Sequence, residues 1–106
     1  MPDMLESRFH DAMVNIYRES LVINYRPRYF LGMVIEFGGV NAAKRLINDR
    51  DVSEGFLTLL RKGKLDLSVE ALVVDNPEYH VLFSSDELAR AKARLLAVGY
   101  SPRENK

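Results

Sequence analysis

The sequence predicts an all-α protein, a compact bundle of six or seven short helices around a central apolar helix. Apolar residues recur at three- and four-residue steps along most of the chain, which is the period of one helical face. Three predicted helix starts carry an acceptor side chain followed three residues later by glutamate, the capping-box pattern. An apolar segment, residues 27–37, ends at a pair of glycines, which favours a helical hairpin.

Length and composition indicate one folded unit. A chain of 106 residues, 47% hydrophobic and 28% charged, predicts a single domain over residues 1–100 and a flexible tail over 101–106. The chain has no cysteine, which excludes disulfides and thiolate metal sites. The N-terminus lacks a basic region followed by an apolar run, so no secretory signal is expected. No apolar run approaches the ~20 residues that span a bilayer, and we therefore expect a cytoplasmic protein without a membrane partner.

The first helix is expected from Asp3 to about Val22. Asp3 and Glu6 form a loose capping box. Its apolar stripe consists of Leu5, Phe9, Met13, Ile16 and Tyr17. His10 lies beside this stripe and is interpreted as a boundary residue with a partly buried ring.

The second helix is expected from Pro27 to Phe37, because proline suits the first turn of a helix. Only Arg28 and Glu36 are charged in it. A helix that is apolar nearly all round is normally covered on several sides, so this segment is predicted to be the core helix. Gly38 or the glycine after it is expected to end the helix with a positive φ.

Two helices follow over residues 40–48 and 51–62. Asp51 and Glu54 are the second capping-box candidate, and Gly63 is the expected stop.

Residues 65–68 alternate between apolar and polar, which is also typical of a strand, but no partner strand is visible. A fifth helix is therefore expected, with Ser68 as N-cap or with Asp66 as N-cap one turn earlier. A short helical turn over residues 77–83 and a last helix opened by the third capping box, Ser84 with Glu87, complete the chain before Gly99.

The sequence contains no catalytic grouping, so we expect no enzyme activity, no cofactor and no metal site. His10 and His80 are the only histidines and are not spaced as a metal motif. Asp66 and Glu70 could share one helical face, which keeps a metal-dependent enzyme as an alternative. Glu70 follows apolar residues so closely that partial burial is expected.

Basic residues alternate with aromatic residues around the first proline break, and two more follow the glycine pair. Guanidinium groups beside stackable rings are suited to phosphate or single-strand contacts. The candidate contact residues for a partner or nucleic acid are Arg26, Arg28, Tyr29, Lys44 and Arg45. A helix-turn-helix interpretation of residues 29–47 is weakened by the balance of 15 basic and 15 acidic residues, which gives no global attraction to nucleic acid.

Many positions together resemble a small helical domain found in uncharacterised bacterial proteins. The most specific part is a Gly-Phe pair followed by Gly-x-Leu-Asp-Leu-x-Val-Glu, residues 55–56 and 63–70. The other matching positions are Tyr25, Phe30, Leu31, Met33, Val34, Gly38, Gly39, Arg45, Leu46, Leu59, Leu72, Leu95, Gly99 and Tyr100. Relatives carry a polar residue or histidine where this chain has Phe37. The resemblance implies the fold and a bacterial source, and no activity.

The leading hypothesis for function is a non-catalytic interaction module, an accessory or regulatory protein that binds a macromolecular partner or itself. The apolar character of residues 27–37 carries this hypothesis, because a small bundle would leave part of that surface open. Nucleic-acid binding through a local basic face is the first alternative, and metal-dependent catalysis the second.

Overall fold

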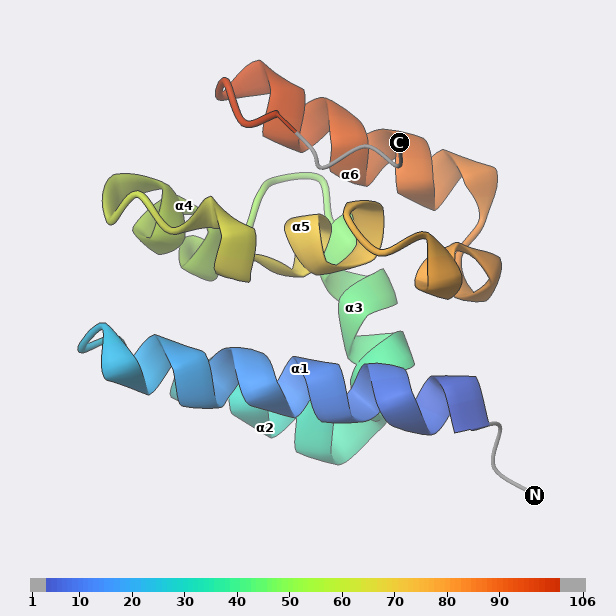
Figure 1. Ribbon diagram of the computed structural model, residues 1–106, viewed down its shortest axis with the longest axis horizontal. Helices are drawn as coiled ribbons and strands as arrows, with labels where there is room; N and C mark the ends of the chain where they lie inside the picture. The colour runs from blue at the N-terminus through green and yellow to red at the C-terminus, as the bar shows by residue number, and fades with distance from the viewer. Residues whose placement is uncertain (1–3, 102–106) are drawn as a thin grey trace.

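A computed structural model of the chain describes residues 4–101 (Figure 1). This part of the chain contains six α-helices and two short 3-10 helices, and no strand. The elements are α1 (Met4–Val22), α2 (Arg28–Phe37), α3 (Gly39–Asn48), α4 (Glu54–Arg61), η1 (Leu65–Leu67), α5 (Val69–Val74), η2 (Pro77–Leu82) and α6 (Ser85–Ala97). The predicted all-α class is therefore confirmed.

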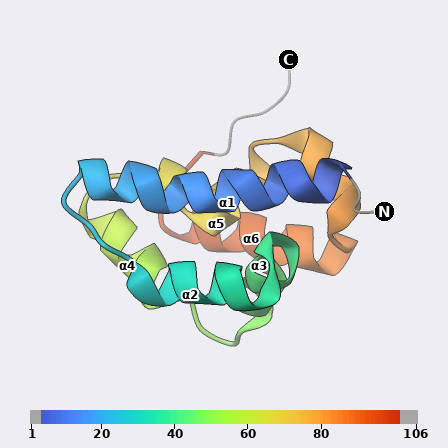
Figure 2. The same cartoon turned by 90° about the horizontal axis from the view of Figure 1, so that it is seen from below.

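The helices form two groups with α3 between them (Figure 1). In that view α1 and α2 lie together on one side, and α4, α5 and α6 lie on the other. Helix α3 packs against α1 and α2 at its beginning and against α5 and α6 further along. Seen from below, α2 lies at the outer edge of the molecule (Figure 2).

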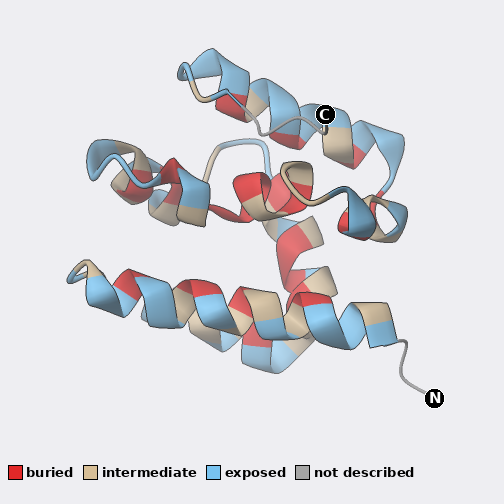
Figure 3. Cartoon of the chain, in the orientation of Figure 1, coloured by how far each residue is buried: buried red, intermediate tan, exposed pale blue. Residues whose placement is uncertain are grey.

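The core lies between these groups. The main cluster draws on α1, α2, α3, α5, η2 and α6, and its buried residues are Phe9, Met13, Ile16, Val34, Ala42, Ala43, Ile47, Val69, Val73, Tyr79, Phe83 and Ala91. The ring of Phe9 meets Tyr79 and Phe83 edge-on, with centroids 5.0 and 5.4 Å away, a favourable arrangement of aromatic pairs. Burial concentrates on α5 and on the inner sides of α1, α3 and α6 (Figure 3).

Helix α2 is not the centre of the bundle, which corrects the sequence-based prediction. Val34 is its only buried side chain, whereas Tyr29 and Ile35 are 86% and 72% exposed. The prediction was wrong because an apolar composition favours burial but does not require that the chain's own helices cover every side. The outer side of α2 has no covering element among the described residues.

Two helix starts follow the predicted caps. The hydroxyl of Ser68 accepts from the Ala71 amide at 3.1 Å, and Ser84 and Glu87 form the reciprocal capping box. The start of α4 is a correction: Ser53, and not Asp51, is its N-cap.

Four other predicted features have mixed outcomes. Residues 65–67 form a 3-10 helix that leads directly into α5, so the strand alternative is wrong. The predicted turn at 77–83 is also a 3-10 helix, η2. The expected cap at Asp3 and the tail, apart from Ser101, lie outside the described residues.

The glycine pair joins α2 to α3 and fixes both on α1. Gly38 has φ +85°, which L side chains rarely adopt, and its amide donates to the Val34 carbonyl at 2.9 Å. The Gly39 amide donates to Nδ1 of His10 at 2.9 Å. A Cβ on Gly39 would lie 2.6 Å from the His10 Cα, so the backbones of α1 and α3 touch here. His10 is half-buried, as expected, and it serves as a structural acceptor.

Candidate functional site

The most unusual surface feature of the described chain is the uncovered side of α2. Its exposed residues are Arg28, Tyr29, Gly32, Ile35 and Glu36, which we call the outer face of α2. These positions recur at three- and four-residue steps and therefore share one side of the helix. A large aromatic and a large aliphatic side chain thus face solvent together.

Gly32 lies at the middle of this outer face. A Cβ added there would meet no atom within 4 Å, so the monomer's own packing does not require a glycine. Glycine inside an exposed helix costs about 1 kcal/mol relative to alanine. What it provides is a bare stretch of helix backbone that another helix could approach closely.

Arg28 and Glu36 mark the two ends of the outer face. Neither forms an ion pair or side-chain hydrogen bond within residues 4–101. They are two turns apart, about 12 Å along the helix axis, which is too far for them to pair with each other. The outer face therefore carries one uncompensated charge of each sign.

Tyr29 also lines a cavity of about 360 Å³, which is bounded by α1, α2, α4, η1 and the start of α5. Its lining is mainly apolar and includes Phe30, Met33 and Phe56, and it contains no lysine or arginine. Ser20 also lines it, and the buried Ser20 hydroxyl has no hydrogen-bond partner among the described residues. An unpaired buried hydroxyl is unfavourable to the fold.

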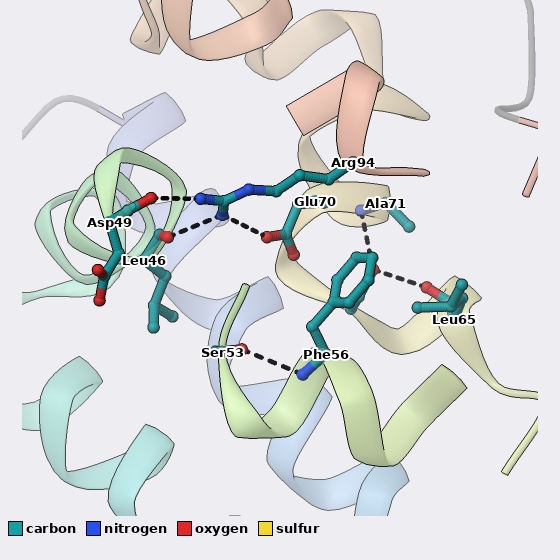
Figure 4. A network of polar contacts seen from close by, with 9 residues as sticks. Leu46, Asp49, Ser53, Phe56, Leu65, Glu70, Ala71 and Arg94 are labelled. Carbon is teal, nitrogen blue, oxygen red and sulfur yellow. Dashed lines mark hydrogen bonds and ion pairs between the residues drawn. The ribbon is translucent and has the colours of Figure 1, made fainter. Parts of the chain in front are cut away.

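Beneath this cavity, a buried ion pair joins α5, α6 and the end of α3. One guanidinium nitrogen of Arg94 donates to Glu70 at 3.1 Å and to the Leu46 carbonyl at 3.0 Å. The other donates to the Asp49 carbonyl. Figure 4 shows the guanidinium reaching all three acceptors. Carbonyls at a helix C-terminus are partially negative, so Arg94 neutralises both the carboxylate and the end of α3.

Glu70 is only 2% exposed, which confirms the expectation of burial. Burial raises the pKa of its carboxyl, and the hydrogen bonds from its own backbone and from Arg94, with the Arg94 charge, only partly oppose this. A perturbed carboxyl in contact with a cavity can indicate catalysis. Here the Arg94 contacts give Glu70 a sufficient structural role.

The structure does not bring the five predicted contact residues together. Arg26, Arg28 and Tyr29 lie at the start of α2, and all three are exposed. Lys44 instead donates to Glu87 at 2.8 Å, and Arg45 lies 3.9 Å above the ring of Phe37, at the far end of α2.

Among these five residues, Lys44 has the clearest structural role. Besides pairing with Glu87, its ammonium lies 5.2 Å from the centroid of Phe83. Asn48 donates to the other oxygen of Glu87 at 2.7 Å, so α3 holds the capping residue of α6 from two positions. Lys44 therefore already has structural partners at and just before the start of α6.

The carboxylates considered for a metal do not form a site. Asp66 is exposed, whereas Glu70 is buried and paired with Arg94. Within residues 4–101 no three histidine or acidic side chains are grouped so that they could hold a metal ion. Metal-dependent catalysis through Asp66 and Glu70 has no geometric support.

Arg94 is the important residue that the sequence analysis missed. It is three residues after buried Ala91 and directly before buried Leu95. That position places an arginine on the inward side of α6, which signals a buried partner. The symmetric spacing of exposed residues on α2 was also missed, because the sequence indicates that part of this apolar surface stays open without indicating which positions face solvent.

Comparison with protein-family models, curated proteins and solved structures finds no match to this chain. The resemblance to a small bacterial domain therefore stays a prediction. In the part of the chain that the structure describes, none of the helices has the length and apolar character needed to cross a membrane.

Proposed function

We propose that this protein is a non-catalytic interaction module, a bacterial accessory or regulatory protein that binds a macromolecule through the outer face of α2. The observation that carries the proposal is the exposure of Tyr29 and Ile35 on one side of a helix with Gly32 between them. Apolar side chains grouped on an otherwise charged surface commonly mark an interaction site.

Other exposed apolar residues support this choice by contrast. Val81 and Leu96 are 79% and 54% exposed on two different elements, η2 and α6, and the exposed pair Leu21 and Val22 are the last two residues of α1. Single exposed apolar residues are normal on protein surfaces and require no explanation. On α2, an aromatic residue, an aliphatic residue and open backbone form one continuous helical side, which suits the docking of another helix.

Nucleic-acid binding has weaker support. Of the predicted basic contacts, Arg26 and Arg28 are exposed together, but Lys44 and Arg45 contact Glu87 and Phe37 instead. A nucleic-acid complex would weaken steeply as salt rises, because phosphate contacts release counterions. Association through apolar side chains would not show that strong dependence.

The proposal can be tested by site-specific photo-crosslinking in cells of the native host. A benzophenone amino acid placed at Ile35 should give a defined protein adduct. The same group at Leu96, an exposed apolar position on α6, is the matched control and should give little. Equal labelling from both positions, or no adduct from position 35, would contradict the proposal.

A further inference from the structure

We propose that the partner of the outer face of α2 is a second copy of the same chain, docked antiparallel about a two-fold axis at Gly32. This inference rests on the proposed function and specifies the partner. It is argued from the order of the exposed residues along the helix.

The outer face is symmetric in position about Gly32. Arg28 and Glu36 lie four residues before and after it, and Tyr29 and Ile35 lie three residues before and after it. In an antiparallel pair of helices that cross at Gly32, position 32 − k of one copy faces position 32 + k of the other. Arg28 then faces Glu36 of the second copy, and Tyr29 faces Ile35, each contact occurring twice.

This arrangement uses every feature of the outer face. The two unpaired charges are compensated, and the aromatic ring packs on an aliphatic side chain. The two glycines meet where the helices are closest, and there a side chain would hold the backbones apart. No other chain is needed to complete the contacts.

A parallel pairing of the same faces is excluded by charge. It would place Arg28 against Arg28 and Glu36 against Glu36, and like charges facing each other oppose association. The sequence order therefore specifies both the partner and its direction.

The paired surface is small. A helix of ten residues is only about 15 Å long, so it buries much less than the typical interface of about 800 Å² per partner. Association is therefore expected to be weak and reversible, with the dimer populated at high protein concentration. Measurements should extend to several hundred micromolar.

Charge exchange gives a direct test by sedimentation equilibrium. In Arg28→Glu, position 28 would repel Glu36 of the second copy, and in Glu36→Arg, position 36 would repel Arg28. We expect either variant alone to associate at least about tenfold more weakly than wild type, since both contacts change from attraction to repulsion. An equimolar mixture of the two variants should associate again as a heterodimer, because both cross-chain contacts are then of opposite sign. The double variant R28E/E36R should also associate with itself.

Arg18→Glu, at an exposed position on α1, is the control for a general effect of charge and should behave as wild type. Circular dichroism checks that each variant folds. The inference is overturned if wild type is monomeric at every concentration, or if the mixture and the double variant do not recover association. A crosslink from position 35 to a protein of different mass would overturn self-pairing while leaving the proposed function intact. Absence of any adduct there, both in cells and in the purified protein at several hundred micromolar, would overturn both.

Discussion

Arg94 and Glu70 form an ion pair whose side chains are only 9% and 3% exposed, with 3.1 Å between nitrogen and oxygen. The pair connects α6 to α5, and the remaining Arg94 donors bind the end of α3. The two helices α5 and α6 are thus connected to the end of α3 through one guanidinium group. Desolvation makes such a pair costly to form, but the loss of one partner is costlier still.

Replacing Arg94 by methionine should lower the free energy of unfolding by about 3 to 5 kcal/mol, because Glu70 would remain buried without its partner. The double replacement R94M/E70M should recover most of that loss, since no buried charge remains. Urea unfolding followed by circular dichroism measures both. Arg90→Met, at an exposed position on the same helix, should change stability by less than about 0.5 kcal/mol. An R94M variant as stable as wild type would show that the pair has no structural role.

Glu87 should govern the response to acid. Burial tends to raise its pKa, but hydrogen bonds from Lys44, the Ser84 backbone and Asn48, with the Lys44 charge, lower it from 4.5 to about 2. A carboxyl whose pKa is lower in the folded state stabilises the fold above its unfolded pKa. That contribution is lost as pH falls from about 4.5 towards 2.

Unfolding by urea at several pH values between about 7 and 2 should show this loss in wild type. In Glu87→Gln the fall should be smaller by roughly 2 to 3 kcal/mol, as expected for a shift of this size. Asp86→Asn, at an exposed neighbour in the first turn of α6, should leave the acid response nearly unchanged. Identical acid profiles for wild type and Glu87→Gln would contradict the assignment. Glu70, whose pKa is raised, should contribute with the opposite sign, favouring the fold at low pH and losing that contribution as pH rises through its folded pKa.

The same substitution should have opposite effects at two glycines. Gly39→Ala should destabilise the protein by at least about 1 to 3 kcal/mol, because the added Cβ meets the His10 backbone at 2.6 Å. Gly32→Ala should stabilise the monomer by about 1 kcal/mol, since the site is open and alanine is the better helix former. It should also weaken self-association. Thermal unfolding at low protein concentration measures the stability changes, and equal signs at the two positions would contradict the packing described here.

Alanine substitutions at two buried serines should likewise change the free energy of unfolding in opposite directions. Ser20→Ala removes a hydroxyl without a hydrogen-bond partner and should raise the free energy of unfolding by about 1 kcal/mol or more. Ser68→Ala removes the N-cap of α5, and the Ser68 hydroxyl also donates to the Leu65 carbonyl at 2.7 Å. This substitution should lower the free energy of unfolding by about 0.5 to 2 kcal/mol. Chemical denaturation of the two variants checks this. A Ser20→Ala variant less stable than wild type would show that the hydroxyl is satisfied, for instance by a bound water.

The rules for helix caps and helix ends predicted several features of this chain correctly. The stops at Gly38, Gly63 and Gly99 are glycines with positive φ, and the caps at Ser68 and Ser84 are as predicted. These features depend on a few neighbouring residues, so one sequence contains the necessary information. The cap of α4 was placed at Asp51 because two acceptors, Asp51 and Ser53, lie close together there.

Relations between distant segments could not be derived in the same way. Arg94 contacts Glu70 and α3 only after three helices have packed, and nothing local to Arg94 identifies its partners. Which side of α2 is exposed could not be predicted from the sequence, for a related reason. Apolar composition does not distinguish a helix covered by its own chain from one that another molecule would cover.

Disulfide trapping tests the central claim about α2 most directly, because the chain has no cysteine of its own and each introduced thiol is unique. Tyr29→Cys and Ile35→Cys are oxidised separately and as an equimolar mixture, with Leu96→Cys as the reference for random collision. The account predicts that the mixed 29–35 disulfide dimer forms faster than either homodimer and faster than the reference. Trapping of Tyr29→Cys with itself at the rate of the mixture, or no trapping above the reference, would contradict antiparallel pairing through the outer face of α2.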